Sequence, residues 1–236
     1  MESQKDQMSA LSYLDIHTHL RTSSHESVVV SSLSVEEISQ KTLIGSYSCA
    51  GIHPWWLEEI SQEVVDHLKV NILELASKGK LWGVGETGLD RLYPEFFDQQ
   101  KELFLWHLDL SESLGLPLII HNVRAGSDFL EIIKEKKPTV PWLFHDFRGN
   151  EELVKNLLRL HESCYFSFGI SIDNSPQIRE LLPQVPLENL FLETDNQKHL
   201  DIHEIYLRAS EQLHLDLDFL KSQLWLNFKK INRQVQ

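Results

Sequence analysis

A short apolar run that ends in two histidines, YLDIHTH at residues 13–19, sets the pattern from which the fold is predicted. Runs of this kind, nearly continuous in apolar residues and bounded by polar turns, are typical of strands buried on both faces of a parallel sheet. Eight of them recur along the chain, at residues 13–16, 28–32, 47–52, 81–85, 118–120, 142–144, 165–168 and 190–192. The sequence therefore predicts a sheet of eight parallel strands.

Amphipathic segments with apolar residues at spacings of three and four separate most of these runs and indicate helices. They cover residues 56–78, 95–114, 127–136, 151–161, 175–182, 202–212 and 217–232. Repeated alternation of strand and helix favours a closed (β/α)8, TIM-like barrel of the α/β class over an open sheet. We expect a single domain over residues 1–236, in which residues 1–11 form an N-terminal extension.

One connection is shorter than this architecture requires. Only a polar loop, residues 20–27, separates the first two predicted strands. A parallel crossover normally needs about a dozen residues or more, so we expect the first crossover helix to be missing or shortened. The outer faces of these two strands would then expose apolar side chains such as Val28 and Val30. We expect residues 1–11 or a homodimer contact to cover them.

Composition points to an ordinary globular protein in a reducing compartment. The chain has 236 residues, of which 42% are hydrophobic and 24% charged. Its two cysteines, Cys49 and Cys164, are too few for a disulfide framework and lack metal-binding spacing. No stretch approaches the roughly 20 apolar residues of a membrane span, and residues 1–10 lack the apolar core of a signal peptide. We expect a cytoplasmic protein with no membrane partner.

The net charge of −13 is unusual for an enzyme that acts on nucleic acid. Proteins that bind the phosphate backbone normally carry basic patches, because neutralising phosphates supplies much of their affinity. Two explanations stay open. Either the substrate is small, or bound cations supply the positive charge that the surface lacks.

Ionisable side chains follow five of the predicted strands at the point where each strand ends. They are His17, His19, Glu86, His121, His145 and Asp195. Active sites of barrel enzymes form at this end of the strands. A single histidine or carboxylate there is more often a cap or a buried structural residue, but independent structural roles would scatter such residues to both ends. Two histidines at alternate positions point the same way, so His17 and His19 can bind one ion.

Four imidazoles and two carboxylates exceed the three protein ligands of one catalytic zinc ion. They suit two divalent cations about 3.5–4 Å apart that share a carboxylate and activate a water molecule. Glu86 is the natural bridge, because its strand lies between the histidine groups. Imidazole ligands favour zinc, manganese, iron or nickel over magnesium, but the sequence does not select among them.

Several sequence blocks resemble signature motifs of the TatD-type deoxyribonuclease family and occur in the same order. They are DIHTH at 15–19, GIHP at 51–54, GETGLD at 85–90, LGLPLIIH at 114–121 and ETD at 193–195. The resemblance extends from Leu14 to Phe228. It implies a barrel of the amidohydrolase superfamily that hydrolyses phosphodiester bonds of DNA, from an end, with two metal ions. By position, the six residues above match the family's metal ligands, and we assign catalytic roles to Glu86 and Asp195 among them.

The positions that follow these ligands depart from the family pattern. NVRA at 122–125 displaces the usual arginine by one position, DFRG at 146–149 replaces a different tetrapeptide, and NQK at 196–198 replaces a segment that usually contains Pro-Tyr. The contacts with substrate are therefore expected to differ. We take His53, Arg124 and Arg148 as candidate substrate-binding residues, because imidazole and guanidinium groups can hydrogen-bond a phosphate. Trp55 and Trp56 could stack on a base or pack the following helix.

Two other functions are compatible with the same ligands. The first is hydrolysis of a small ester, lactone or amide, as in other branches of the superfamily. Such barrels often bridge their metals with a carbamylated lysine, whereas the fourth strand here ends in Glu86. The second is a non-catalytic metal-binding relative. We expect a metal-dependent hydrolase whose substrate is DNA or a small phosphodiester.

Overall fold

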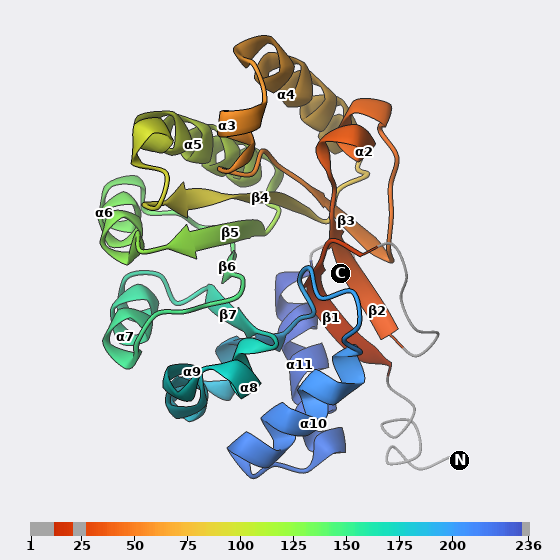
Figure 1. The fold of residues 1–236 in the computed structure, drawn as a ribbon, viewed down its shortest axis with the longest axis vertical. Coiled ribbons are helices and arrows are strands. Elements are labelled where there is room, and N and C mark those ends of the chain that lie inside the picture. Colours follow the sequence, from red (N-terminus) through yellow and green to blue (C-terminus); the bar gives the residue numbers. More distant parts are fainter. Residues whose placement is uncertain (1–11, 21–26, 233–236) are drawn as a thin grey trace.

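The protein is described here by a computed structural model that covers residues 12–20 and 27–232. Within these residues, eight parallel strands form one sheet in the order of the sequence (Figure 1). The strands are β1 (Tyr13–Thr18), β2 (Ser27–Ser32), β3 (Tyr47–Ala50), β4 (Gly83–Asp90), β5 (Leu118–Val123), β6 (Trp142–Phe144), β7 (Cys164–Phe168) and β8 (Leu190–Leu192). All eight predicted strands are present, which confirms the predicted barrel.

The sheet closes between β8 and β1 at the carboxyl ends of these strands. Thr18 and Asp195 form an isolated parallel bridge. The amide of His19 donates to the Asp195 carbonyl oxygen at 3.1 Å, and the amide of Asp195 donates to the His17 carbonyl oxygen at 3.0 Å. Closure therefore fixes the backbone of Asp195 directly beside the two histidines that end β1.

Helices α4 to α7 form a row outside β4 to β7 in Figure 1. The longer helices are α4 (Gln62–Ser77), α5 (Phe97–Leu114), α6 (Gly126–Lys136), α7 (Glu151–Leu160), α10 (Ile202–Leu213) and α11 (Leu217–Ile231). The shorter ones are α2 (Val35–Gln40), α3 (Trp56–Glu59), α8 (Ser171–Asn174) and α9 (Pro176–Leu181), with 3-10 turns at η1 (Pro94–Phe96), η2 (Leu182–Gln184) and η3 (Leu187–Asn189). In the described residues, no helix is long and apolar enough to cross a membrane.

Several helical segments differ from the prediction, and the short helix α8 was not predicted at all. The segment predicted as one helix over residues 56–78 is two helices, α3 and α4, because Ile60 is extended and the Ser61 hydroxyl caps α4 by accepting from the Val64 amide. The prediction missed α2, although its start carries a sequence signal. Ser34 and Glu37 form a reciprocal capping box, the S-x-x-E pattern that commonly begins a helix.

The prediction of a missing or shortened first crossover helix falls mainly on residues 21–26, which lie outside the described residues, and stays a prediction. Only residues 19–26 link β1 to β2, and the two of them that the structure describes, His19 and Leu20, are not helical. Residues 1–11, predicted to cover this region, lie outside the described residues.

The predicted exposure of Val28 and Val30 is wrong. Val30 is 1% exposed and Val28 is partly buried, and both pack in the cluster that fills the barrel interior. The alternation of side chains along β2 turns these valines inward and Val29 outward. Phe228 and Ile231 of α11 complete this cluster. The Phe228 ring stacks on the ring of Trp82, the residue just before β4, with 5.4 Å between the ring centroids. The C-terminal helix therefore closes the amino end of the barrel.

Candidate metal centre

Glu86 lies at the centre of the candidate site, on β4 and only 4% exposed. The register of β4 with β5 shifts between Val84 and Thr87, and such irregularities re-aim side chains. Gly85 precedes the glutamate with φ +130°, and a Cβ there would lie 2.5 Å from the Ile119 carbonyl oxygen. A glycine is therefore required for this approach of β4 to β5.

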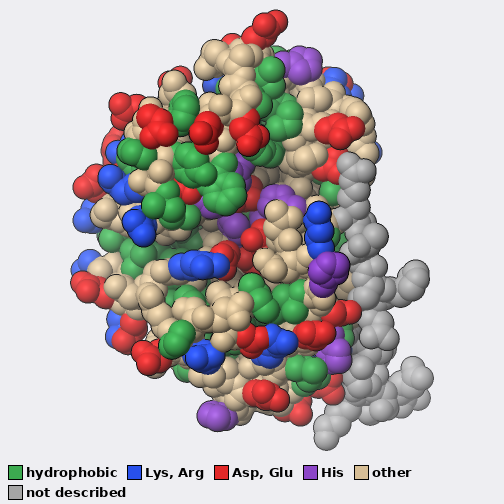
Figure 2. All heavy atoms as spheres, in the orientation of Figure 1, with side chains coloured by type: hydrophobic (Ala, Val, Ile, Leu, Met, Phe, Trp, Pro, Cys, Tyr) green, Lys and Arg blue, Asp and Glu red, His purple; other side chains and the backbone are tan. Residues whose placement is uncertain are grey.

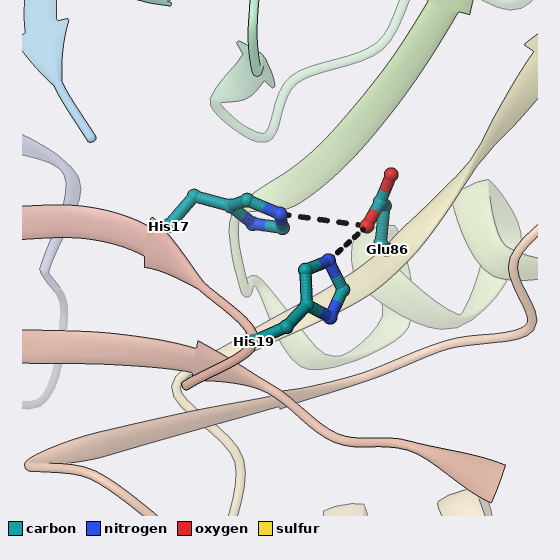
Figure 3. Close-up of side chains that lie close together, drawn as sticks. All are labelled: His17, His19 and Glu86. Atoms are coloured by element: carbon teal, nitrogen blue, oxygen red, sulfur yellow. Dashed lines mark hydrogen bonds and ion pairs between the residues drawn. The ribbon is translucent and has the colours of Figure 1, made fainter. Parts of the chain in front are cut away.

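Five imidazoles surround the two carboxylate oxygens of Glu86. Oε2 is 3.4 Å from His17 Nε2 and 3.0 Å from His19 Nε2 (Figure 3). Oε1 is 2.9 Å from His53 Nε2, 3.2 Å from His121 Nδ1 and 2.6 Å from His145 Nε2. One oxygen thus faces the two histidines of β1, and the other faces histidines from the ends of β3, β5 and β6.

Asp195 completes the side of the site formed by β1. Its Oδ1 lies 3.7 Å from His17 Nε2 and 3.6 Å from His19 Nε2. The side chain is 31% exposed and contributes to the wall of a pocket of about 410 Å³ above Glu86. Figure 2 shows histidine side chains gathered in the hollow at the centre of this face. The six ligands predicted from the sequence therefore converge on one place.

The donors of this cluster fit divalent cations. Three groups have ligand atoms within 4.8 Å of one another: His17, His19 and Glu86; His17, His145 and Asp195; and His53, Glu86 and His121. His17 Nε2 and both ring nitrogens of His145 are buried without a hydrogen bond of good geometry. Such orphaned nitrogens are costly in a folded protein, and a coordinated cation would satisfy them. The buried negative charge of Glu86 would also attract a cation.

Histidine 53 belongs to this cluster but has a different hydrogen-bonding state. Its Nδ1 accepts a hydrogen bond from the Trp55 amide at 3.1 Å, so the proton of the neutral ring is on Nε2, which faces Glu86. A protonated Nε2 donates a hydrogen bond and cannot bind a cation. Burial lowers the pKa of His53 despite the nearby Glu86 charge, so the ring stays neutral. This geometry disfavours a ligand role for His53 and directs its one N–H at Glu86 Oε1, so its predicted contact with substrate stays a prediction.

Neighbouring charges in the cluster shift the pKa values in the opposite direction to burial. Burial alone would raise the pKa of Glu86, but the surrounding imidazoles hold it well below its usual range. Burial alone would lower the pKa of His145, but Glu86 and Glu193 raise it well above its ordinary value. Glu86 in the same way raises the pKa of His19 and, together with Asp90, that of His121. Cations must replace the protons on these imidazoles, so metal affinity should fall as the pH decreases.

Buried carboxylates behind the cluster orient its members, a role that the sequence reasoning missed. Glu193 is fully buried, accepts from the Asp146 amide and the Ser167 hydroxyl, and lies 3.6 Å from His145 Nδ1. Carboxylates that hold a ligating histidine from behind are common at metal centres. The signal was in the sequence, because Glu193 is two residues before Asp195, at the end of β8.

Asp90 has the corresponding position behind His121. Its Oδ2 is 3.3 Å from His121 Nε2 and accepts from the Trp55 indole at 2.6 Å. Its Oδ1 accepts from the Leu92 amide at 2.8 Å. Asp90 ends β4 in the same GETGLD block that contains Glu86, so its position was also marked in the sequence.

The two predicted arginines occupy different places. Arg148 contributes to the pocket wall, and its guanidinium pairs with Asp146 at 2.8 Å with 62% of the side chain exposed. Arg124 is exposed, has a positive φ of 56° and does not line the pocket. The structure thus brings Arg148 to the site and leaves Arg124 outside it.

His107 anchors the chain just before the site, and its titration gives a testable stability effect. Its Nε2 accepts from the Ile52 amide at 3.0 Å and its Nδ1 donates to the Leu103 carbonyl oxygen at 2.7 Å. Burial lowers its pKa to about 3, whereas the unfolded chain takes up this proton near pH 6.5. The contribution to stability is therefore complete above pH 6.5 and is lost as the pH falls toward 3, at up to about 1.4 kcal/mol per pH unit.

We expect His107→Gln, which keeps an acceptor and a donor, to remove this part of the pH dependence. Urea denaturation of both proteins at pH 7.5 and pH 5 measures it, because other titrating groups are common to the pair and cancel in the comparison. The free energy of unfolding of the native protein should fall more steeply toward pH 5. Parallel pH dependences would show that His107 titrates normally.

Fold and site together define a class: a (β/α)8 barrel whose strand ends hold a cluster of histidines and carboxylates, an arrangement typical of metal-dependent hydrolases. The family model for TatD related DNase matches residues 16–231, and the chain belongs to this family.

Several curated proteins are similar to this chain. It is 34% identical over 152 residues to the uncharacterized metal-dependent hydrolase YcfH of Escherichia coli strain K12, covering 64% of this chain and 55% of that protein. It is 32% identical over 153 residues to the 3'-5' ssDNA/RNA exonuclease TatD of Erwinia billingiae, covering 63% and 57%. The match to the metal-dependent hydrolase TatD of Mycobacterium tuberculosis is 27% over 155 residues, covering 63% and 57%. The chain thus spans little more than half the length of these relatives.

Solved structures show the same fold. The TatD homologue YjjV of Escherichia coli K12 has a TM-score of 0.77 at 19% identity, covering 93% of this chain and 97% of that one. A TatD family hydrolase of Entamoeba histolytica has a TM-score of 0.74 at 18% identity, covering 95% and 99%.

Proposed function

We propose that this protein hydrolyses phosphodiester bonds at an end of single-stranded nucleic acid, DNA above all, with two divalent cations. The observation that carries the proposal is the division of donors around one carboxylate. Glu86 Oε2 faces His17 and His19, whereas Oε1 faces His121 and His145. A carboxylate with histidines on both oxygens suits a pair of ions, and paired ions are common in enzymes that cleave phosphate esters.

The relatives support this substrate class. The Erwinia protein is named an exonuclease of single-stranded DNA and RNA, and a human relative, 31% identical over 166 residues that make up 21% of its length, is named a 3'-5' RNA nuclease. The negative surface is compatible with such a substrate, because cations at the centre offset the net charge of −13 where the phosphate binds. Imidazole ligands favour manganese, zinc or nickel over magnesium.

In the proposed reaction, each group of the protein has a defined role. Cations would be held by Glu86, His17, His19, His121, His145 and Asp195, and they would supply Lewis acidity at the phosphoryl group and acidify a water molecule. Asp195 is partly exposed in the pocket, so its free oxygen can orient that water and accept its proton. Arg148 would donate hydrogen bonds to phosphate oxygens, and His53 Nε2 would do so only in place of its contact with Glu86. Glu193 and Asp90 keep His145 and His121 in place.

The test is turnover on single-stranded DNA labelled at either end, with manganese or magnesium added. We expect stepwise shortening from one end that a chelator stops. The same protein is offered a panel of simple esters, lactones and amides. If the protein hydrolyses members of that panel and leaves the oligonucleotides intact, its substrate is a small ester, lactone or amide. If metal-loaded protein turns over none of these substrates, the protein is a non-catalytic relative. A cytoplasmic location and a homodimer, both expected from the sequence, stay predictions.

A further inference from the structure

One wall of the pocket contains a tryptophan side chain that is unusually exposed to solvent. Trp55, just before α3, lines the pocket and is 47% exposed. Tryptophan is normally buried over most of its surface. Its neighbour Trp56 follows this rule, because it is partly buried against the main hydrophobic core. Packing of α3 on the barrel therefore accounts for Trp56 and leaves the exposure of Trp55 unexplained.

A hydrogen bond and two ring contacts fix the orientation of the exposed indole of Trp55. Its Nε1 donates to Asp90 Oδ2 at 2.6 Å, and Asp90 is fully buried. Its ring lies 4.8 Å from the His53 ring and 5.3 Å from the His121 ring, both in edge-to-face geometry. The N–H is the only polar group of an indole. Because Asp90 accepts from it, the surface that remains exposed is the apolar aromatic part of the ring.

The surroundings of Trp55 combine apolar and phosphate-binding groups. Leu92, 55% exposed, lies on the same pocket, and its amide donates to the other oxygen of Asp90. One buried carboxylate thus fixes both Trp55 and Leu92. Arg148 and the cluster around Glu86 contribute to the same pocket. A ligand that fills it would need a flat apolar face next to an anionic phosphate.

We propose that Trp55 is the stacking platform for the base of the nucleotide next to the scissile phosphate, an inference that rests on the proposed function. A nucleobase has the required flat face and lies one sugar away from the phosphate that the cations would bind. Base–aromatic stacking tolerates every base, because each has a π-face. A base within a duplex is stacked on both faces by its neighbours, so Trp55 can accept only a base at an end or in a single strand.

Binding of short oligonucleotides to Trp55→Leu and Trp55→Phe tests this role separately from turnover. The probes are a single-stranded DNA octamer with phosphorothioate linkages and two matched octamers that lack the base at the 3′-terminal or the 5′-terminal nucleotide. Affinity for manganese-loaded protein is measured by fluorescence anisotropy. Trp55→Leu should bind the complete octamer roughly 5- to 150-fold more weakly, the range of one base–aromatic stack, and Trp55→Phe should recover most of this loss. Phe219→Leu, another exposed aromatic (51%) that lines no part of the pocket, is the matched control.

The decisive comparison is between the octamers. The loss caused by Trp55→Leu should disappear on at least one octamer that lacks a terminal base, because the partner of the indole is then absent. Equal losses on all three octamers, or no loss on any, would overturn the proposal while leaving the proposed function intact. Failure of the native protein to bind or shorten any oligonucleotide would instead remove the proposed function together with this inference. Manganese content and melting temperature show whether the variants keep their metal centre and fold.

Discussion

Replacement of Glu86 by glutamine should empty the centre of cations and abolish turnover. The variant keeps the size and one oxygen of the side chain but removes the charge that both histidine groups face. Loss of a carboxylate that only supports a metal ligand costs 10–100-fold in metal affinity, so loss of one that faces both groups should cost at least about 100-fold. Isothermal titration with manganese measures the affinity, and nuclease assays measure the turnover.

The same substitution has a second consequence that does not depend on metal. Glu86 raises the pKa values of His19, His121 and His145, so these imidazoles should titrate at lower pH in metal-free Glu86→Gln, as NMR can show. Glu112→Gln is a matched control, since Glu112 accepts hydrogen bonds from Thr139 away from the site. Unchanged metal affinity in Glu86→Gln would contradict the central position assigned to this residue.

Replacement of Asp195 by asparagine should reduce turnover roughly 10²–10⁴-fold, the usual contribution of a positioned general base. Asp195 has a φ of +49°, a conformation that asparagine also adopts readily, and its backbone pairing with β1 does not involve the side chain. The melting temperature should therefore change little, and at least one cation should stay bound by the imidazoles and Glu86. Single-turnover kinetics at saturating substrate separates this loss from weaker binding.

Asp146→Asn provides a control of the same chemistry in the same pocket. Asp146 also has a positive φ, 35°, and contributes to the pocket wall, but its carboxylate pairs with Arg148 instead of the histidines of β1. Its substitution should affect the binding of substrate more than the rate of the chemical step. Near-normal turnover in Asp195→Asn, or an equal loss in both variants, would show that Asp195 is not the base.

Much of the fold and most of the candidate site could be predicted because both depend on local patterns. The buried strands are short apolar runs, and the ligands are the ionisable residues that end them. In a parallel barrel, the ends of all strands lie on one face, so residues far apart in sequence, such as His17 and His145, could be placed together. The prediction required the positions of the strand ends but no knowledge of side-chain packing.

The features that were missed depend on contacts that no local pattern defines. Val28 and Val30 were assigned to the wrong face because the inward side of a strand buried on both faces cannot be read from an apolar run. Glu193 and Asp90 lie at strand ends that the sequence marks, but which histidine each one supports depends on its distances to His145 and His121. The tautomer of His53 likewise follows from a hydrogen bond with the Trp55 amide. The helix α2 is the exception, because its capping box was present in the sequence.

The central claim, that Glu86 joins two cation sites, is tested most directly by anomalous X-ray scattering from crystals soaked with manganese. The account predicts two anomalous peaks on opposite sides of the Glu86 carboxylate, one beside His17 and His19 and the other beside His121 and His145. A single peak, or peaks that do not contact Glu86, would contradict it.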